Sequence, residues 1–241
     1  MTASVQPPVA GDWYEPVPDI DGHGIRAFTT TRAAGSFGVA SEEPVRVVMG
    51  RWDRLRAELA ASGPRLATGH QVHGDRVLKH GTGWEGWLRA GDADGHLAIE
   101  RGTGMAVSIA DCVPVFIAHE SGAVALLHSG WRGTAARIVE RAIDVLGSRG
   151  VPANELTLHL GPSICGRCYE VSPDVFGQLT GRSVDRPTTV DLRALIADHA
   201  RARGVRRISA SVRCTRCDND RFFSHRAGDG GRQLGVMIAA L

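Results

Sequence analysis

Two short apolar runs near the middle of the chain, residues 113–118 and 123–127, are rich in Val, Ile, Leu and Phe, and a polar His-Glu-Ser-Gly segment separates them. Continuous apolar runs of this length between turn-forming residues predict buried β-strands. The same reasoning predicts strands over 24–32, 66–79, 96–99, 156–160, 208–214 and 233–239, and the run 66–79 is interrupted by a polar turn that carries histidines.

A helical pattern covers residues 44–61, because apolar side chains recur on one side of the predicted helix and Arg and Glu on the other. The apolar side consists of Val47, Val48, Trp52, Leu55 and Leu59. Further helical patterns cover 135–146, 173–179 and 191–203. Residues 81–101 are rich in Gly, Trp and Asp, and we expect them to be irregular apart from the strand at 96–99.

The chain shows no repeat, no low-complexity tract and no linker, and its length of 241 residues suits one large α/β domain. We therefore expect a single domain over residues 20–241. Prolines punctuate residues 1–19, which we expect to form a flexible leader.

Composition narrows the class of protein. A hydrophobic content of 43% and a charged content of 22% are ordinary for a soluble globular protein. The net charge of +2 argues against a dedicated nucleic-acid-binding protein. No apolar stretch reaches about 18 residues, and the N-terminus lacks a signal peptide, so we expect no membrane span and a cytoplasmic location. Thiols stay reduced there, so the five cysteines are expected to be ligands, nucleophiles or buried thiols.

A thiol and an imidazole are expected at neighbouring strand ends, because Cys112 precedes one central strand and His128 follows the other. With His73 they form a candidate metal site: these ligand atoms suit zinc or copper, and three protein ligands leave a fourth position open. The alternative is a metal-free pair in which His128 activates Cys112 as a nucleophile, and Asp94 or Asp111 orients the histidine. Spacing alone does not decide between the two.

The segment Ser-Gly-Trp-Arg-Gly-Thr at 129–134 leads from a strand into a predicted helix. Its glycines allow close backbone approach, the start of a helix offers free N–H groups, and Arg132 supplies a planar fork for phosphate or carboxylate. The other interpretation is a glycine-rich turn with a solvated arginine. No GxxxxGK[ST] P-loop occurs in the chain.

Two CxxC pairs, Cys165–Cys168 and Cys214–Cys217, match the signature of a zinc knuckle. The segment between the pairs is longer than the roughly 15–20 residues that are usual. A structural zinc, a disulfide and four unlinked thiols all remain open.

Near the C-terminus, Phe222 and Phe223 are followed by Ser-His and Arg226. The aromatic rings are candidates for stacking on a planar ligand, with Arg226 as its anion partner. The alternative is a strand whose Phe residues alternate between core and surface, and for Phe222 we prefer a place in the core.

Several motifs occur together and in order. They are QVHG (71–74), DAD (92–94), ADCVPV (110–115), HSGWRGT (128–134), GPSI…YEV (161–171), CT (214–215) and FFSHR (222–226). With this set, the chain resembles the laccase-domain or polyphenol-oxidase-like proteins, which more recent descriptions call purine nucleoside phosphorylases. The resemblance runs from about residue 29 to the C-terminus.

The resemblance implies a monomeric, single-domain α/β (α+β) sandwich in which mixed β-sheets are flanked by helices. It places the family's metal ligands on His73, Cys112 and His128, with zinc, or alternatively copper, as the cofactor. The family's acidic residue upstream of ADC falls on Asp94, a candidate acid or base.

The arginine of the family's HxGWRG motif falls on Arg132, which with Cys112 and Asp94 completes the expected catalytic set. We expect Arg32 and Arg226 to join Arg132 in binding the substrate. The implied activities are phosphorolysis of adenosine, inosine and methylthioadenosine, and hydrolytic deamination of adenosine, so the partners are a small nucleoside and phosphate. The segments AGSFGVASEEP and FSHRA depart from the family pattern and bear on substrate preference more than on the metal site.

Two other functions remain open. One is a Cys–His hydrolase or amidase acting on a cell-wall or peptide substrate, with Cys112 as nucleophile and His128 as base. The other is a metal-binding protein without enzymatic activity. Multicopper oxidation is disfavoured, because a trinuclear copper cluster is held largely by HxH pairs, and the 10 histidines of this chain form none.

Overall fold

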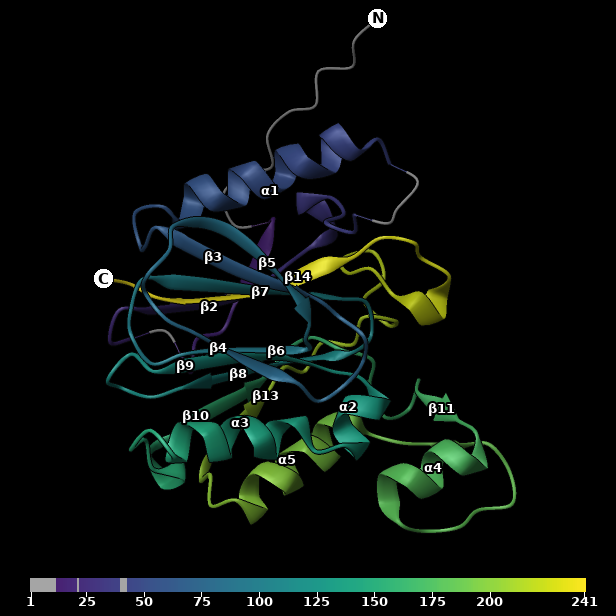
Figure 1. Cartoon of the computed structure of the whole chain (residues 1–241). Coiled ribbons are helices and arrows are strands. Elements are labelled where there is room, and N and C mark those ends of the chain that lie inside the picture. Colours follow the sequence, from purple (N-terminus) through teal and green to yellow (C-terminus); the bar gives the residue numbers. More distant parts are fainter. Residues whose placement is uncertain (1–11, 21, 40–42) are drawn as a thin grey trace, which may run out of the picture.

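The computed structural model describes residues 12–20, 22–39 and 43–241, and these form four layers (Figure 1). Two six-stranded sheets lie face to face in the middle, and helices cover both outer faces. Each sheet contains both parallel and antiparallel neighbours. The expected α/β sandwich of mixed sheets flanked by helices is therefore confirmed.

The first sheet has the strand order β1-β2-β14-β7-β3-β5. Its strands are β1 (Tyr14–Pro16), β2 (Ile25–Thr30), β14 (Gln233–Ala239), β7 (Thr103–Ile109), β3 (Arg65–His70) and β5 (Gly86–Asp92). The second sheet has the order β13-β10-β8-β9-β6-β4. Its strands are β13 (Arg207–Ala210), β10 (Thr157–Leu160), β8 (Val113–Ala118), β9 (Val124–Ser129), β6 (Gly95–Ala98) and β4 (Val77–His80).

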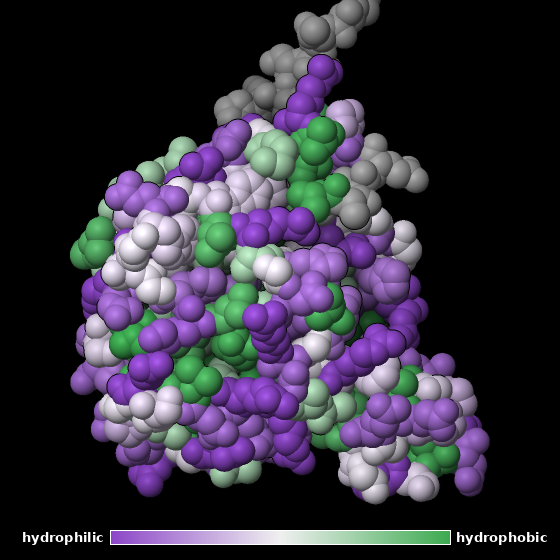
Figure 2. Space-filling view, in the orientation of Figure 1, coloured by the Kyte–Doolittle hydropathy of each residue, from purple (hydrophilic) through white to green (hydrophobic). Residues whose placement is uncertain are grey.

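Helices and short elements complete the described chain. The α-helices are α1 (Val45–Leu59), α2 (Trp131–Ala135), α3 (Ile138–Gly147), α4 (Pro173–Thr180) and α5 (Leu192–Ala202). The 3-10 turns are η1 (Arg32–Ala34), η2 (Ala153–Glu155) and η3 (His225–Ala227), and β11 (Glu170–Val171) pairs with β12 (Thr188–Thr189). In the space-filling view, the α4 region at the lower right projects from the body of the molecule (Figure 2).

Apolar clusters fill the space between successive layers. Met105 and Met237 of the first sheet pack against Phe116 and Leu126 of the second. Helix α1 packs on the outer face of the first sheet, and α3 and α5 pack on the outer face of the second. Full burial of one such side chain contributes about 1.5–3 kcal/mol to the stability of the fold. The packed layers therefore hold the strands, and the residues at their ends, in fixed positions.

Continuous apolar runs predicted the central strands well. The strands expected at 113–118 and 233–239 have those bounds, as β8 and β14. The helix expected at 44–61 is α1. The run 66–79 contains β3 and β4, with the histidine-bearing turn between them.

Two local expectations were wrong. Residues 81–101 are not mainly irregular, because they contain β5, which pairs in parallel with β3. Its Trp87 ring stacks on Trp52 of α1 at 4.7 Å, a tertiary contact that outweighs the Gly-rich composition. The helix expected at 135–146 is α3, but it begins at Ile138 rather than at residue 135, because Arg137 has a left-handed φ of 61° and separates it from the short helix α2.

The folded part begins earlier than the expected start at residue 20. Residues 1–11 of the expected leader lie outside the described residues, whereas β1 pairs with β2 and Val17 is buried. The strand expected at 208–214 ends at Ala210, so Cys214 lies in the loop beyond it. No described helix has the length and apolar character needed to cross a membrane.

Candidate active site

His73, Cys112 and His128 come together at one end of the sandwich. Cys112 directly precedes β8, and His128 lies near the end of the antiparallel strand β9, opposite Pro114. His73 lies in the turn that leads from β3 in the first sheet to β4 in the second. One ligand atom from each of the three residues lies within 4.8 Å of the other two. The structure thus brings together the trio expected from the sequence, and metal binding by it stays a prediction.

A buried carboxylate holds the turn that carries His73. The backbone N–H groups of Val72 and Gly74 donate to Asp94 Oδ2 at 3.1 and 2.8 Å, and that of His73 donates to Oδ1 at 3.0 Å. His73 has a φ of 61°, a left-handed conformation that is uncommon outside glycine. The three hydrogen bonds stabilise this conformation and so fix the backbone position from which the His73 side chain extends.

Gln71 ties the same turn to the first sheet. Its Oε1 accepts from the backbone N and the Oγ of Ser108 at 2.7 and 2.9 Å, and its Nε2 donates to the Ser108 carbonyl at 2.8 Å. Ser108 lies on β7, four residues before Cys112. Gln71 therefore joins the turn that carries His73 to the strand that leads to Cys112, through both its amide oxygen and its amide nitrogen.

Asp94 also holds His128 in place, through the histidine's Nδ1 and its backbone N–H. His128 Nδ1 lies 2.7 Å from Asp94 Oδ1, and the backbone N–H of His128 donates to the Asp94 carbonyl at 2.7 Å. Because Nδ1 is engaged, Nε2 is the nitrogen left to face Cys112. Burial alone would raise the pKa of Asp94, but hydrogen bonds from His128 and the backbone outweigh it and lower the pKa. Asp94 is fully buried, a placement that suits a positioning role better than the expected proton transfer to substrate.

Cys112 and His128 favour each other's charged forms. Burial raises the pKa of the Cys112 thiol, but the charge on His128 and hydrogen bonds from His128 and His73 lower it to about 6. Burial lowers the pKa of His128, but Cys112 and Asp94 raise it to about 9. A metal ligand and a nucleophile both need the thiolate, so this electrostatic pattern agrees with both interpretations of the trio.

Gly130 makes room for the trio. A Cβ atom at this position would lie 2.9 Å from Cys112 Sγ and 3.3 Å from His73 Cδ2. Gly133 plays a similar part, because its Cβ would lie 2.9 Å from the Gly74 carbonyl oxygen. The two glycines of the GWRG segment therefore let α2 pack directly on the histidine turn.

Asp111 connects Cys112 to two later loops. Its Oδ1 accepts from Thr215 Oγ1 at 2.6 Å, and its Oδ2 accepts from the backbone N–H of Arg226 at 2.7 Å. Its carbonyl accepts from the Ile164 N–H at 3.0 Å. Asp111 has a left-handed φ of 85° and is buried, so these bonds hold an unfavourable backbone conformation directly before Cys112. Of the two carboxylates considered for orienting His128, the structure places Asp94 there and Asp111 elsewhere.

Charged and aromatic groups lie around this centre. The exposed Arg132 guanidinium lies 4.4 Å from the centre of the Trp131 ring and makes no ion pair with a described residue. Arg226 is exposed, donates to the Glu170 carbonyl and lies 5.2 Å from the Tyr169 ring centre. Burial raises the pKa of Tyr169 to about 12, with a contribution from the Cys112 charge and opposing ones from Arg226 and Arg132. Tyr169 is thus the group among these that feels the charges on Cys112, Arg226 and Arg132 together.

Arg32 is occupied by protein groups. Its guanidinium donates to the carbonyls of Asn219 and Phe222 at 2.9 and 3.1 Å and pairs with Asp229 at 2.7 Å. It also lies 4.3 Å from the Phe223 ring centre. Phe222 is fully buried, as expected. Arg32 therefore organises the C-terminal loop, and its expected contact with substrate stays a prediction.

The motifs also contain residues that shape the candidate site although spacing did not indicate their contacts. Gln71, Gly130 and Tyr169 all lie inside the quoted motifs, but their roles depend on contacts with residues far away in the chain. For Asp111, the only indication in the sequence was its position directly before Cys112. Its left-handed backbone is not visible in the residue type.

The comparisons with known proteins agree with these motifs. The family model described as multi-copper polyphenol oxidoreductase laccase matches residues 28–240. A purine nucleoside phosphorylase of Mycobacterium tuberculosis is 36% identical over 227 residues, which cover 84% of this chain and 86% of that protein. A protein named adenosine deaminase, from an unknown prokaryotic organism, is 35% identical over 150 residues, which cover 56% of this chain and 55% of that protein.

A solved structure shares the fold over nearly the whole chain. The crystal structure of YlmD from Geobacillus stearothermophilus matches with a TM-score of 0.85 at 26% identity and covers 93% of this chain and 94% of that one. The match to the family model spans every residue of the site just described. The chain therefore belongs to the multi-copper polyphenol oxidoreductase laccase family, as its motifs indicated.

Proposed function

We propose that this chain is a zinc-dependent purine nucleoside phosphorylase that also deaminates adenosine. The observation that carries the proposal is the meeting of His73, Cys112 and His128, whose ligand atoms lie within 4.8 Å of one another. The relatives named purine nucleoside phosphorylase and adenosine deaminase support the choice of reaction.

The donor set fits zinc. Two imidazoles and one thiolate are typical zinc ligands, and a site with three protein ligands keeps one position open, as catalytic zinc sites do. The Asp94 carboxylate behind His128 is the group that commonly orients a zinc-bound histidine. Copper also binds two histidines and a cysteine and is the alternative metal. We prefer zinc because neither proposed reaction transfers electrons.

The residues around the metal position supply anion binding and orientation. When bound, zinc supplies a Lewis acid that polarises an oxygen atom at the open position. Arg132 binds phosphate through its planar fork, since no described residue neutralises its charge. In phosphorolysis a phosphate oxygen bonds to C1′ of the ribose as the bond from C1′ to the purine nitrogen breaks, and the purine keeps that electron pair. Arg132 holds the anion against the developing positive charge on the sugar.

Tyr169 and Arg226 are the groups we assign to the purine. Because its pKa is raised to about 12, Tyr169 keeps its hydroxyl proton at neutral pH and can donate a hydrogen bond to the departing base. Arg226 lies against the Tyr169 ring. Asp94 is buried and ionised, so we assign it the positioning of His73 and His128. Arg32 positions the C-terminal loop.

A second candidate function rests on the same atoms. The series Cys112–His128–Asp94 has the connectivity of a nucleophile, a base and an orienting carboxylate, so a metal-free protein is suited to a cysteine hydrolase or amidase reaction. This interpretation leaves the contact of His73 with Cys112 unused, whereas the metal site uses it. A metal-binding protein without activity is the third candidate.

Product analysis separates the three candidates. Adenosine is incubated with zinc-loaded protein, with and without phosphate, and adenine, ribose-1-phosphate and inosine are quantified. Hypoxanthine is quantified as well, because inosine is itself open to phosphorolysis. Our proposal predicts that ribose-1-phosphate forms only with phosphate and equals the sum of adenine and hypoxanthine, and that inosine forms in both reactions. Fully metallated protein that forms neither product overturns it. Alkylation of Cys112 by iodoacetamide that abolishes an amidase activity, together with inhibition of that activity by zinc, supports the second candidate.

A further inference from the structure

The two CxxC pairs lie side by side although a long segment separates them in the sequence. Cys165 and Cys168 follow β10, and Cys214 and Cys217 follow β13, and these strands are parallel neighbours with Leu160 opposite Ala210. Loops that leave the same ends of adjacent parallel strands run together. Ser163 and Cys214 form a parallel bridge, and the Thr215 N–H donates to the Ser163 carbonyl at 3.1 Å.

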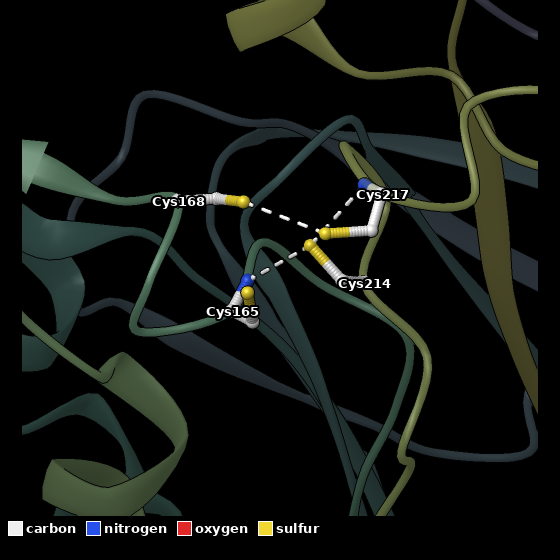
Figure 3. A group of neighbouring side chains, drawn as sticks. All are labelled: Cys165, Cys168, Cys214 and Cys217. Carbon is white, nitrogen blue, oxygen red and sulfur yellow. Dashed lines mark hydrogen bonds between the residues drawn. The ribbon is translucent and has the colours of Figure 1, made fainter.

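The four sulfur atoms gather between these loops (Figure 3). All four Sγ atoms lie within 4.8 Å of one another, and Cys168 and Cys217 approach to 3.5 Å. A tetrahedral zinc with Zn–S bonds of about 2.3 Å places its sulfur atoms about 3.8 Å apart. The cysteines are free, and 3.5 Å is far beyond the roughly 2.05 Å of a disulfide bond.

Backbone groups support negative charge on the buried sulfur. Cys214 Sγ accepts from the backbone N–H of Cys165 at 3.3 Å and from that of Cys217 at 3.5 Å. One of these bonds comes from the other CxxC pair and one from its own. Cys214 is buried and Cys217 is exposed, so the cluster extends from the interior to the surface. Hydrogen bonds of this kind commonly orient and tune thiolate ligands of metals.

We propose that Cys165, Cys168, Cys214 and Cys217 hold a second metal ion, a zinc ion in a closed tetrathiolate site. Four protein ligands leave no open position, so the ion is structural. Iron–sulfur clusters also use four cysteines, but they spread the sulfur atoms over several irons, whereas sulfur atoms within 4.8 Å of one another suit a single ion.

This second ion clamps the loops that hold Asp111. Ile164 precedes Cys165 and donates to the Asp111 carbonyl, and Thr215 follows Cys214 and donates to Asp111 Oδ1. Tyr169 follows Cys168. The closed site therefore fixes the backbone directly before Cys112 without touching the first metal position. The metal count that tests the second site is independent of the proposed function.

Elemental analysis of protein purified under reducing conditions tests this proposal. We expect two zinc ions per chain in the unaltered protein, one in Cys217→Ser and one in Cys112→Ala. Cys217 is the exposed member of the cluster, so its replacement disturbs packing least. Arg167→Ser, an exposed change inside the first CxxC pair, is the matched control and keeps both ions. We also expect Cys217→Ser to lower the Tm by about 5 °C or more.

The outcomes separate this proposal from the proposed function. One ion that is lost in Cys112→Ala and kept in Cys217→Ser overturns the second site and leaves the proposed function intact. One ion lost only in Cys217→Ser supports the second site and overturns the first.

Native mass spectrometry of the unaltered protein keeps the test valid if a variant fails to fold. Two bound zinc ions on a fully reduced chain support the proposal. A chain lighter by two hydrogen atoms without a second ion identifies a disulfide and overturns it, and bound iron in place of the second zinc overturns the choice of metal.

Discussion

Asp94 and His128 are joined twice, once from His128 Nδ1 to the Asp94 carboxylate and once from the His128 backbone N–H to the Asp94 carbonyl, both at 2.7 Å. The same carboxylate receives three backbone N–H groups from the turn that carries His73. One buried side chain therefore positions two of the three proposed metal ligands.

Replacement of Asp94 by Asn tests this arrangement. The amide must place an NH2 group where backbone N–H donors or His128 Nδ1 now meet oxygen, so the ligands lose their orientation. We expect zinc affinity, measured by competition with a chromophoric chelator, to fall about 10- to 100-fold. Asp92→Asn is the matched control, because Asp92 is exposed and, among the described residues, its carboxylate contacts only His70. Equal zinc affinity in both variants would show that Asp94 does not position the zinc ligands.

Gly130→Ala tests the close approach of the ligands. The added Cβ would lie 2.9 Å from Cys112 Sγ, so the trio must separate while the layers around it stay intact. We expect a folded protein, judged by an unchanged circular dichroism spectrum, that has lost the zinc of the His73–Cys112–His128 site. Gly81→Ala, where a Cβ meets no atom of the described residues within 4 Å, should keep that zinc. Normal metal content in Gly130→Ala would contradict the geometry.

Arg132→Gln tests the assignment of the phosphate position. Charge-assisted hydrogen bonds contribute about 1.5–3 kcal/mol each, which corresponds to a rise of about 10- to 100-fold in the KM for phosphate. Deamination uses no phosphate, so its rate should stay near that of the unaltered protein. Arg149→Gln, an exposed change just beyond the end of α3, serves as control. A parallel loss of both activities would assign Arg132 to the nucleoside instead.

His96 predicts a pH dependence of stability. It is fully buried, stacks on His80 at 5.1 Å, and its Nε2 has no hydrogen-bond partner among the described residues. Burial and then the charge on His80 lower its pKa to about 3, while the nearby Asp94 opposes this. An unfolded histidine has a pKa of about 6.5. Below that pH the unfolded chain binds a proton that the folded chain does not.

The stability that His96 contributes is therefore complete above about pH 6.5 and is lost as the pH falls toward 3, by at most about 1.4 kcal/mol per pH unit. Burial also lowers the pKa of His80, which adds loss in the same direction. Urea unfolding measures the free energy of unfolding at each pH. Between about pH 6 and about pH 4, this free energy should change less steeply with pH in His96→Leu than in the unaltered protein. His225→Gln, at an exposed histidine, should keep the original slope. An unchanged slope in His96→Leu would refute this assignment.

The sequence predicted those parts of the fold that depend on local patterns. The run 113–118 became β8 because an unbroken apolar segment has no alternative to burial between layers. Cys112 and His128 were expected together because each lies at the end of a strand, and the antiparallel pairing of β8 and β9 placed them so. His73 joined them through the turn between β3 and β4.

Features that depend on which strands pair in the folded chain could not be predicted from the sequence. The role of Asp94 follows from the pairing of β6 with β9, which places Gly95 opposite Leu127 and so brings Asp94 behind His128. The meeting of the CxxC pairs depends on the parallel pairing of β10 and β13, which no residue spacing indicates. The left-handed backbone of Asp111 is held by residues far away in the chain, so its residue type does not indicate it. The left-handed Arg137 interrupts a helical pattern that is continuous in the sequence.

Zinc titration of metal-free protein, followed by the rate of phosphate-dependent ribose-1-phosphate formation from adenosine, tests the central claim most directly. We predict that the rate is negligible without metal and rises in proportion to zinc bound by His73, Cys112 and His128. We also predict that Cys112→Ala stays inactive at every zinc concentration. Metal-free protein that forms ribose-1-phosphate at the full rate would contradict the account.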